Sequence, residues 1–137
     1  MKYTLPLGLL ILISLASCQS GQSGESSQSV KANPSPQVEH VVLLWLKNPA
    51  DIAGRQRIVD ATKTFTQIPG VLSVSVGKAI PGQAPIVDGT FDVGIVIRFK
   101  DHQSLLNYNP HPIHKKAADE ILVPQAKTIK VYDVECQ

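Results

Sequence analysis

The sequence predicts an α+β domain in which one antiparallel sheet is covered by helices on a single face. Three observations lead to this fold class: four segments with strand periodicity, two helical segments, and the order β-α-β-β-α-β along the chain. The 137 residues leave room for one such domain and a tail. A multidomain protein is therefore excluded.

The first strand is predicted over residues 38–47, VEHVVLLWLK. Alternate residues from His40 to Leu46 share one face of this strand, and Val41, Leu43 and Trp45 share the other. Because both faces are apolar, we expect a central strand that is covered on both sides.

A helix is predicted over residues 50–66, followed by a second strand. Pro49 and Asp51 favour the start of the helix, and residues 58, 61, 62 and 65 recur at the spacing of one helical face. Ile-Pro-Gly at 68–70 ends it. The segment VLSVSVGKA at 71–79 alternates apolar residues with serine, which predicts a half-exposed strand at an edge of the sheet.

The third strand and a short helical turn come next. A loop at residues 81–89 precedes TFDVGIVIRF at 90–99, the clearest alternation in the chain. Asp101 is suited to cap a short helical turn that runs to about Asn107. Asn109 is expected to be extended, because a residue before proline disfavours the helical region.

A second helix and a last strand complete the domain. Pro112 occupies the first-turn position that proline tolerates, and Pro124 ends the helix. Its inward stripe is predicted to consist of His114, Ala118, Ile121 and Leu122. The last strand is TIKVYDV at 128–134.

This element order fits the split βαβ, ferredoxin-like arrangement, in which the strands lie in the order 4-1-3-2. Helices then cover only one face of the sheet. The other face of a strand as apolar as residues 38–47 would then be exposed to water. A second copy of the domain is the simplest partner that could bury this face. We therefore expect a homodimer.

The N-terminal residues predict export. Residues 1–17 have a positive start at Lys2 and an apolar core, as in a signal peptide. The tetrad Leu15-Ala16-Ser17-Cys18 resembles the bacterial lipobox, which implies cleavage before Cys18 and lipidation of its thiol. The rival interpretation is an uncleaved membrane helix, but the apolar run at 4–17 is shorter than the roughly twenty residues that a bilayer requires.

The predicted anchor places the protein at a membrane surface. Gln19 stands where an Asp would retain such a lipoprotein in the inner membrane, so the outer membrane is expected in a host with two. Residues 18–37 comprise the lipidated cysteine and a flexible tether rich in Ser, Gln, Gly and Pro. The folded domain spans 38–135. Cys136, then the only free thiol, is either a buried terminal thiol or an intermolecular bridge.

Charge and glycine patterns exclude several classes of protein. The formal net charge is +2 with no basic stripe, so nucleic acid is not an expected partner. Gly77, Gly82 and Gly89 form no phosphate-binding pattern. We find no cofactor signature and expect no cofactor.

Four polar side chains are predicted to meet at one end of the sheet: His40, Tyr108, His114 and Asp133. An imidazole near a phenol in an apolar pocket can remove a proton next to a carbonyl group and polarise that carbonyl. In this hypothesis His114 is the base, Asp133 orients it, and Tyr108 donates a hydrogen bond. His40 and His111 contact the ligand. The alternative is that the same residues only stabilise the core.

These segments carry a family resemblance. VEHVVLLWLK, IPGV, FDVGIVIRFKDHQSLLNY, the run from Tyr108 to His114 and VYDVE resemble the stress-responsive dimeric α/β barrel (Dabb) family over about residues 38–135. The resemblance implies a dimeric ferredoxin-like barrel. One plant member is a polyketide cyclase that forms olivetolic acid, and its catalytic histidine and tyrosine match His114 and Tyr108. Its strand-1 histidine and its aspartate match His40 and Asp133.

A metal site is a further alternative. His111 and His114, three residues apart, could bind a divalent metal together with Asp133 or His102. Two histidines are few for such a site, and the hypothesis we adopt includes no metal.

The sequence thus predicts a membrane-tethered, exported Dabb-like homodimer that binds a small, largely apolar ligand. His114 would give it cyclase-like or lyase-like proton-transfer chemistry. The alternative is a non-enzymatic, stress-associated structural or interaction module.

Overall fold

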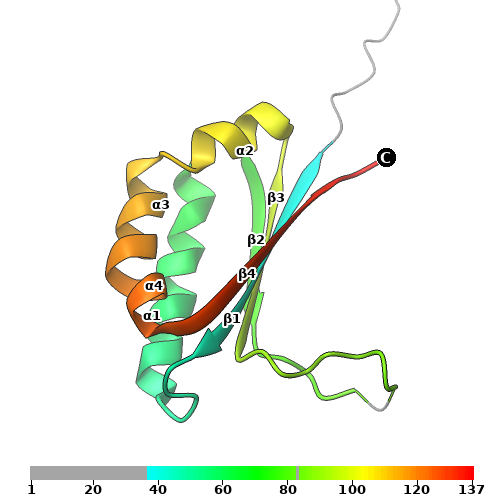
Figure 1. Ribbon diagram of the computed structural model, residues 1–137. Helices are drawn as coiled ribbons and strands as arrows, with labels where there is room; N and C mark the ends of the chain where they lie inside the picture. The colour runs from blue at the N-terminus through cyan, green and yellow to red at the C-terminus, as the bar shows by residue number, and fades with distance from the viewer. Residues whose placement is uncertain (1–36, 83) are drawn as a thin grey trace, which may run out of the picture. The chain divides into compact units, whose positions relative to one another are not determined.

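The computed structural model describes residues 37–82 and 84–137 (Figure 1). The predicted signal peptide, the lipidated Cys18 and nearly all of the tether lie outside the described residues.

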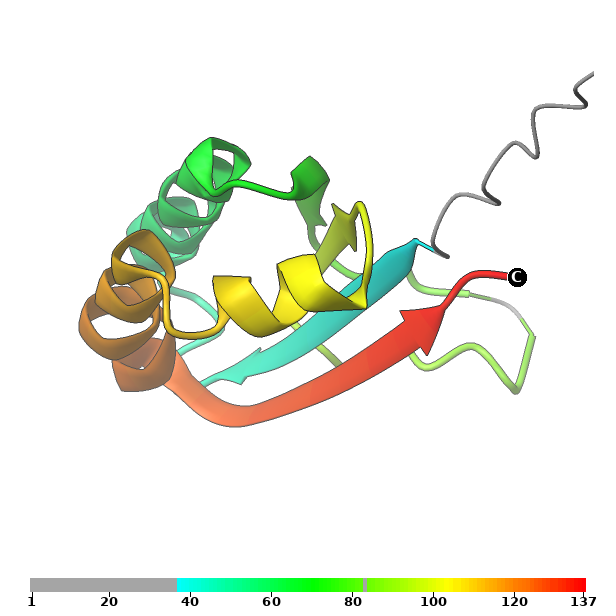
Figure 2. The ribbon, with the colours of Figure 1, turned by 90° about the horizontal axis from the view of Figure 1, so that it is seen from above.

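Four antiparallel strands form one sheet. They are β1 (Val38–Leu46), β2 (Val71–Gly77), β3 (Val93–Phe99) and β4 (Ala126–Glu135), in the order β2-β3-β1-β4. The predicted order 4-1-3-2 is confirmed, as are the central place of β1 and the edge position of β2. The structure therefore has the ferredoxin-like α+β fold, with its helices on one side of the sheet (Figures 1 and 2).

The helices follow the predicted segments. Helix α1 (Ile52–Lys63) continues into the short helix η1 (Thr64–Gln67), and α2 (His102–Tyr108) follows β3. Asp101 caps α2 as predicted, since its carboxylate accepts hydrogen bonds from the backbone N–H and the hydroxyl of Ser104 at 2.8 and 2.7 Å. No helix of the described residues is long and apolar enough to span a membrane.

The predicted helix at 112–124 is broken into three parts. These are α3 (Pro112–Ala117), the π-helical turn η2 (Ala118–Leu122) and α4 (Val123–Gln125). Pro124 explains the wide turn, because its ring lacks an N–H and would clash with the carbonyl four residues earlier.

The core lies between the helices and the sheet. The side chains of Leu44, Ile58, Val93, Ile97 and Phe99 have no measurable exposure. Alternate residues of β1 are buried from Val38 to Leu46, as the sequence pattern predicts. His40 and Thr62 are the buried polar residues of the part that the structure describes.

β3 begins three residues later than predicted. Asp92 already bonds to β1 without joining the ladder, because its N–H donates to the Leu44 carbonyl at 2.8 Å and its carboxylate accepts from the Leu46 N–H at 2.8 Å. Residues 90–92 thus form the base of the loop. β4 runs longer than predicted at both ends.

Helices leave one side of the sheet uncovered (Figures 1 and 2). We call this side the bare face, and the strand registers place on it Val41, Leu43, Trp45, Val96, Tyr132 and Val134. Val96, Tyr132 and Val134 are exposed apolar or aromatic residues. The same registers also place Glu39, Arg98, Lys130, Ser73 and Ser75 on this face, so its apolar residues lie among charged and polar ones.

Candidate functional site

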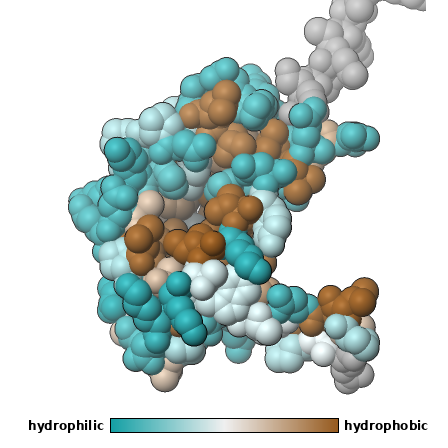
Figure 3. All heavy atoms as spheres, in the orientation of Figure 1, coloured by the Kyte–Doolittle hydropathy of each residue, from teal (hydrophilic) through white to brown (hydrophobic). Residues whose placement is uncertain are grey.

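A cavity of about 300 Å³ opens between the helix-facing side of β1 and β4 and the helices α3 and η2. The space-filling view shows it as a hollow bordered by apolar residues (Figure 3). Its walls are mostly apolar: Val42, Phe65, Ile95, Ile97, Ala118, Leu122, Val123, Ile129 and Val131. His40, Tyr108, Asn109, His114 and Asp133 add polar groups. The four residues predicted to meet at one end of the sheet therefore line one cavity.

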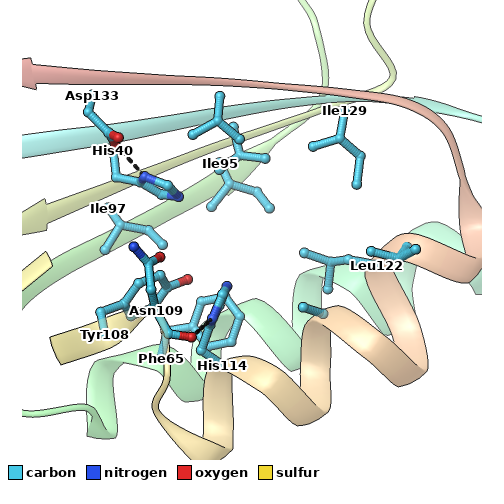
Figure 4. Close-up of a pocket in the computed structure, with 14 residues that line it drawn as sticks. His40, Phe65, Ile95, Ile97, Tyr108, Asn109, His114, Leu122, Ile129 and Asp133 are labelled. Carbon is cyan, nitrogen blue, oxygen red and sulfur yellow. Dashed lines mark hydrogen bonds and ion pairs between the residues drawn. The ribbon is translucent and has the colours of Figure 1, made fainter. Parts of the chain in front are cut away.

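His40 and Asp133 face each other across neighbouring strands. They are register partners in β1 and β4, and His40 Nδ1 lies 2.6 Å from Asp133 Oδ1. A carboxylate only accepts hydrogen bonds, so Nδ1 carries the proton and donates it. The other ring nitrogen, Nε2, is directed into the cavity (Figure 4).

The predicted partnership of Asp133 with His114 is wrong. The antiparallel register sets Asp133 opposite His40, and its carboxylate bonds to His40, while His114 Nδ1 bonds to the Asn109 carbonyl. His114 lies across the cavity on α3 instead (Figure 4). Asp133 therefore orients His40.

Tyr108 ends α2 and is 1% exposed. Its ring packs edge-on against His40, Phe65 and Phe99, with centroid distances of 5.8, 5.5 and 5.0 Å. Burial raises the pKa of the phenol, so the hydroxyl stays neutral and can donate a hydrogen bond at physiological pH. Figure 4 shows this hydroxyl directed toward the cavity, with no hydrogen bond to any of the residues drawn.

His114 looks inward from the first turn of α3, as predicted. Its Nδ1 lies 2.9 Å from the backbone carbonyl of Asn109, which can only accept, so Nδ1 carries the proton. Nε2 is left as an acceptor that faces the cavity (Figure 4). The ring also lies against the Tyr108 ring, with 4.3 Å between centroids.

The surroundings of His114 favour its neutral form. Burial is the largest cause that lowers the pKa of this imidazole, and the nearby His40 and His111 lower it further. The hydrogen bond to the Asn109 carbonyl and the charge of Asp119 oppose this shift without reversing it. At neutral pH His114 is an uncharged base in a largely apolar cavity.

Asn109 is not extended as predicted. Its backbone is helical, with φ −55° and ψ −47°. Two backbone hydrogen bonds hold this turn, from Asn109 N–H to the Leu105 carbonyl and from His111 N–H to the Tyr108 carbonyl. They outweigh the preference of a residue before proline, and the resulting turn aims the Asn109 carbonyl at His114.

His111 does not line the cavity, so its predicted contact with the ligand is wrong. It is the N-cap of α3, and its extended backbone turns the side chain back so that Nδ1 accepts from the Ile113 N–H at 3.3 Å. Within residues 37–82 and 84–137, no three His, Cys, Asp or Glu side chains come together as metal ligands, and His102 is exposed on α2.

Sequence reasoning gave no functional role to the other ten residues that line the cavity, among them Phe65, Asn109 and Val123. Phe65 is part of the predicted helical stripe and carried no functional signal. Asn109 acts through its backbone, which no side-chain pattern indicates. The π turn brings Val123 to the cavity beside Leu122, whereas Ile121 faces the groove between α1 and α3.

Together these residues give the cavity three atoms that can exchange or share protons. They are Nε2 of His40, the hydroxyl of Tyr108 and Nε2 of His114 (Figure 4). Among residues 37–82 and 84–137, no lysine or arginine lines the cavity. Such a site can take a proton from an uncharged molecule and stabilise the oxygen on which negative charge develops.

The fold and this site define a ferredoxin-like domain with a cavity between its sheet and its helices. The chain belongs to the stress responsive A/B barrel domain (Dabb) family, whose model matches residues 38–136. No curated protein matches the sequence.

Several solved structures share the fold. A Dabb family protein from Mesorhizobium loti is 24% identical, with a TM-score of 0.62 over 75% of this chain and 99% of that one. The hydroxynitrile lyase of Passiflora edulis is 20% identical, with a TM-score of 0.62 over 77% of this chain and 96% of that one. A dimeric ferredoxin-like protein of unknown function from Thermobifida fusca is 20% identical, with a TM-score of 0.61 over 74% of this chain and 92% of that one.

We predict that His114 makes the stability of the domain depend on pH. The pKa of His114 is lowered on folding, so the unfolded chain binds more protons near that pKa. The stabilisation is complete above the unfolded value of about 6.5 and is lost as the pH falls through the folded pKa. Urea unfolding at pH 7.5 and 5.0 should show a larger loss of stability for the wild type than for His114→Gln. An NMR titration that gives His114 a pKa of 6.5 or above would contradict this.

Proposed function

We propose that the domain binds a small, uncharged and largely apolar molecule with a carbonyl or hydroxyl group, and that His114 transfers a proton on it. The Tyr108 hydroxyl carries this proposal, because it faces the cavity without a hydrogen bond to the residues around it (Figure 4). It can therefore donate a hydrogen bond to a polar group of a ligand in the cavity.

Size and charge narrow the class of ligand. A volume of about 300 Å³ is at the lower end of ligand pockets, which span about 300–1,000 Å³. Asp133 is the acidic residue of the lining, and no lysine or arginine of the described residues lines the cavity to pair with an anion. Both features favour a small neutral molecule over a carboxylate or phosphate.

The geometry supports a proton-transfer mechanism. Nε2 of His114 removes a proton from a hydroxyl group or from a carbon next to a carbonyl. The neutral Tyr108 hydroxyl donates a hydrogen bond to the oxygen that gains negative charge. His40, held by Asp133, supplies a second nitrogen on the opposite wall (Figure 4). The hydroxynitrile lyase of Passiflora edulis supports a lyase-type reaction, since a hydroxynitrile is a small neutral molecule with one hydroxyl group.

The competing function is a non-enzymatic module in which these rings only stabilise the fold. The edge-on packing of the Tyr108 ring against three neighbours favours this role for the ring. This packing does not explain why the residue carries a hydroxyl group, since a phenylalanine ring would pack in the same way. Substituting the hydroxyl alone therefore separates the two functions.

The test uses acetophenone as a small neutral ketone and measures its binding and its methyl-proton exchange in D₂O by NMR. Tyr108→Phe should keep the unfolding free energy within about 0.5 kcal/mol of wild type or raise it, because the lost hydroxyl has no protein partner. It should weaken ketone binding about two- to tenfold, the value of one hydrogen bond. His114→Ala should slow the exchange by at least about a hundredfold.

Matched variants control this test. Tyr132→Phe removes a hydroxyl from the bare face, and His102→Ala removes an exposed imidazole, so both should bind and exchange like the wild type. If Tyr108→Phe and His114→Ala bind and exchange like these controls, the proposed function is wrong and the structural module is favoured.

We also propose that the chain is exported and anchored to a membrane through lipidated Cys18. The support is the signal-like segment at 1–17 and the lipobox-like tetrad before Cys18. In a bacterial host fed an alkyne analogue of palmitate, the full-length chain should take up label. Cys18→Ala should lose the label and Cys136→Ala should keep it, whereas label in Cys18→Ala would contradict the anchor.

We further propose that the chain forms a homodimer through its bare face. The apolar residues of this face support it, since a second copy would remove them from water. Similar structures from Thermobifida fusca, Bacteroides fragilis and a Jannaschia species are described as dimeric.

A further inference from the structure

The segment between β2 and β3 projects from the sheet on the side away from the helices (Figures 1 and 2). We call residues 78–82 and 84–92 of this segment the arm. In the space-filling view the arm ends in apolar residues far from the rest of the domain (Figure 3). It extends past the bare face, where the fold offers no helix or strand of its own for these residues to contact.

The base of the arm is fixed to the sheet. The Trp45 indole N–H donates to the Thr90 hydroxyl at 3.0 Å, and the Trp45 and Phe91 rings meet edge-on with 6.4 Å between centroids. The Thr90 N–H donates to Asp88 Oδ1 at 2.9 Å. Trp45 belongs to the bare face, so its contact with Phe91 makes the apolar surface continuous from the sheet into the arm.

The two limbs of the arm also contact each other. A Cβ added at Gly82 would lie 2.5 Å from a methyl carbon of Val87, so the Gly82 backbone packs directly on that side chain. A Cβ at Gly89 would lie 3.5 Å from Pro81 Cα. With prolines at 81 and 85 as well, the arm has a defined shape rather than that of a loose loop.

The end of the arm is apolar and exposed. The side chains of Ile80 and Ile86 are 81% and 93% exposed, and Val87 is half exposed. Three such residues at the end of an ordered projection indicate a binding surface. Residues 79–87 contain no aromatic and no basic residue, the types that favour a membrane-interface segment, so the composition favours a protein partner.

We infer that the arm is a dimerisation clasp, whose Ile80 and Ile86 pack on a second copy of this chain seated on the bare face. This inference rests on the proposed homodimer. The continuity through Trp45 and Phe91 places the arm at the rim of that face, and its direction carries it beside whatever covers the face. Twofold symmetry would give two arms, one from each copy, and so bury both apolar ends.

The test is sedimentation velocity of the full-length chain in detergent, which gives the dimer dissociation constant. The double variant Ile80→Asp/Ile86→Asp should raise this constant at least about tenfold, because two buried isoleucines would be replaced by charges. Ile52→Asp is the matched control, since Ile52 is 76% exposed but lies on α1, on the helical side. It should leave the constant unchanged. Val96→Asp, in the middle of the bare face, should abolish the dimer.

The outcomes separate the clasp from the dimer itself. If the arm variant dimerises like Ile52→Asp while Val96→Asp is monomeric, the clasp is wrong and the homodimer stands. If the wild type is monomeric at micromolar concentration, the homodimer fails and the clasp fails with it. Photocrosslinking from p-benzoylphenylalanine in place of Ile86 should join two copies, and the same group in place of Ile52 should not. Crosslinks from position 86 that stay within one copy would also overturn the clasp.

Discussion

The chemistry of the site depends on one hydrogen bond, between His114 Nδ1 and the backbone carbonyl of Asn109. It places the ring proton on the side away from the cavity, so that Nε2 faces the cavity as a base. Both residues belong to one short segment, in which a backbone turn after α2 leads directly into α3. The orientation of the base is therefore built into the connection between two helices.

The sheet forms the opposite wall of the site, and a separate hydrogen bond orients the histidine on that wall. The antiparallel register of β1 and β4 pairs His40 with Asp133, and their bond directs a second imidazole nitrogen toward the same space. The Tyr108 ring lies between the two histidines and is held by packing. Two fixed imidazoles and a neutral phenol in a mostly apolar cavity are preorganised for proton transfer on a neutral molecule.

The sequence patterns predict the fold and the meeting of the site residues, but not their pairing. Alternation in residues 38–47 and 90–99 identifies strands whose order along the chain leaves few topologies, so the sheet order could be predicted. The partner of Asp133 depends on a register that alternation does not specify to one residue. The helical backbone of Asn109 and the π turn at 118–122 arise from competing local preferences, which hydrogen bonds in the folded structure decide.

The tautomer of His114 tests the account most directly, because the proposed base exists only if its proton is on Nδ1. Long-range ¹H–¹⁵N correlation spectra of the uniformly labelled full-length chain at pH 7.5 distinguish the protonated ring nitrogen from the bare one. The account predicts that His114 carries its proton on Nδ1, with Nε2 unprotonated. A His114 ring with its proton on Nε2, or one that averages between both forms as a free histidine does, would contradict it.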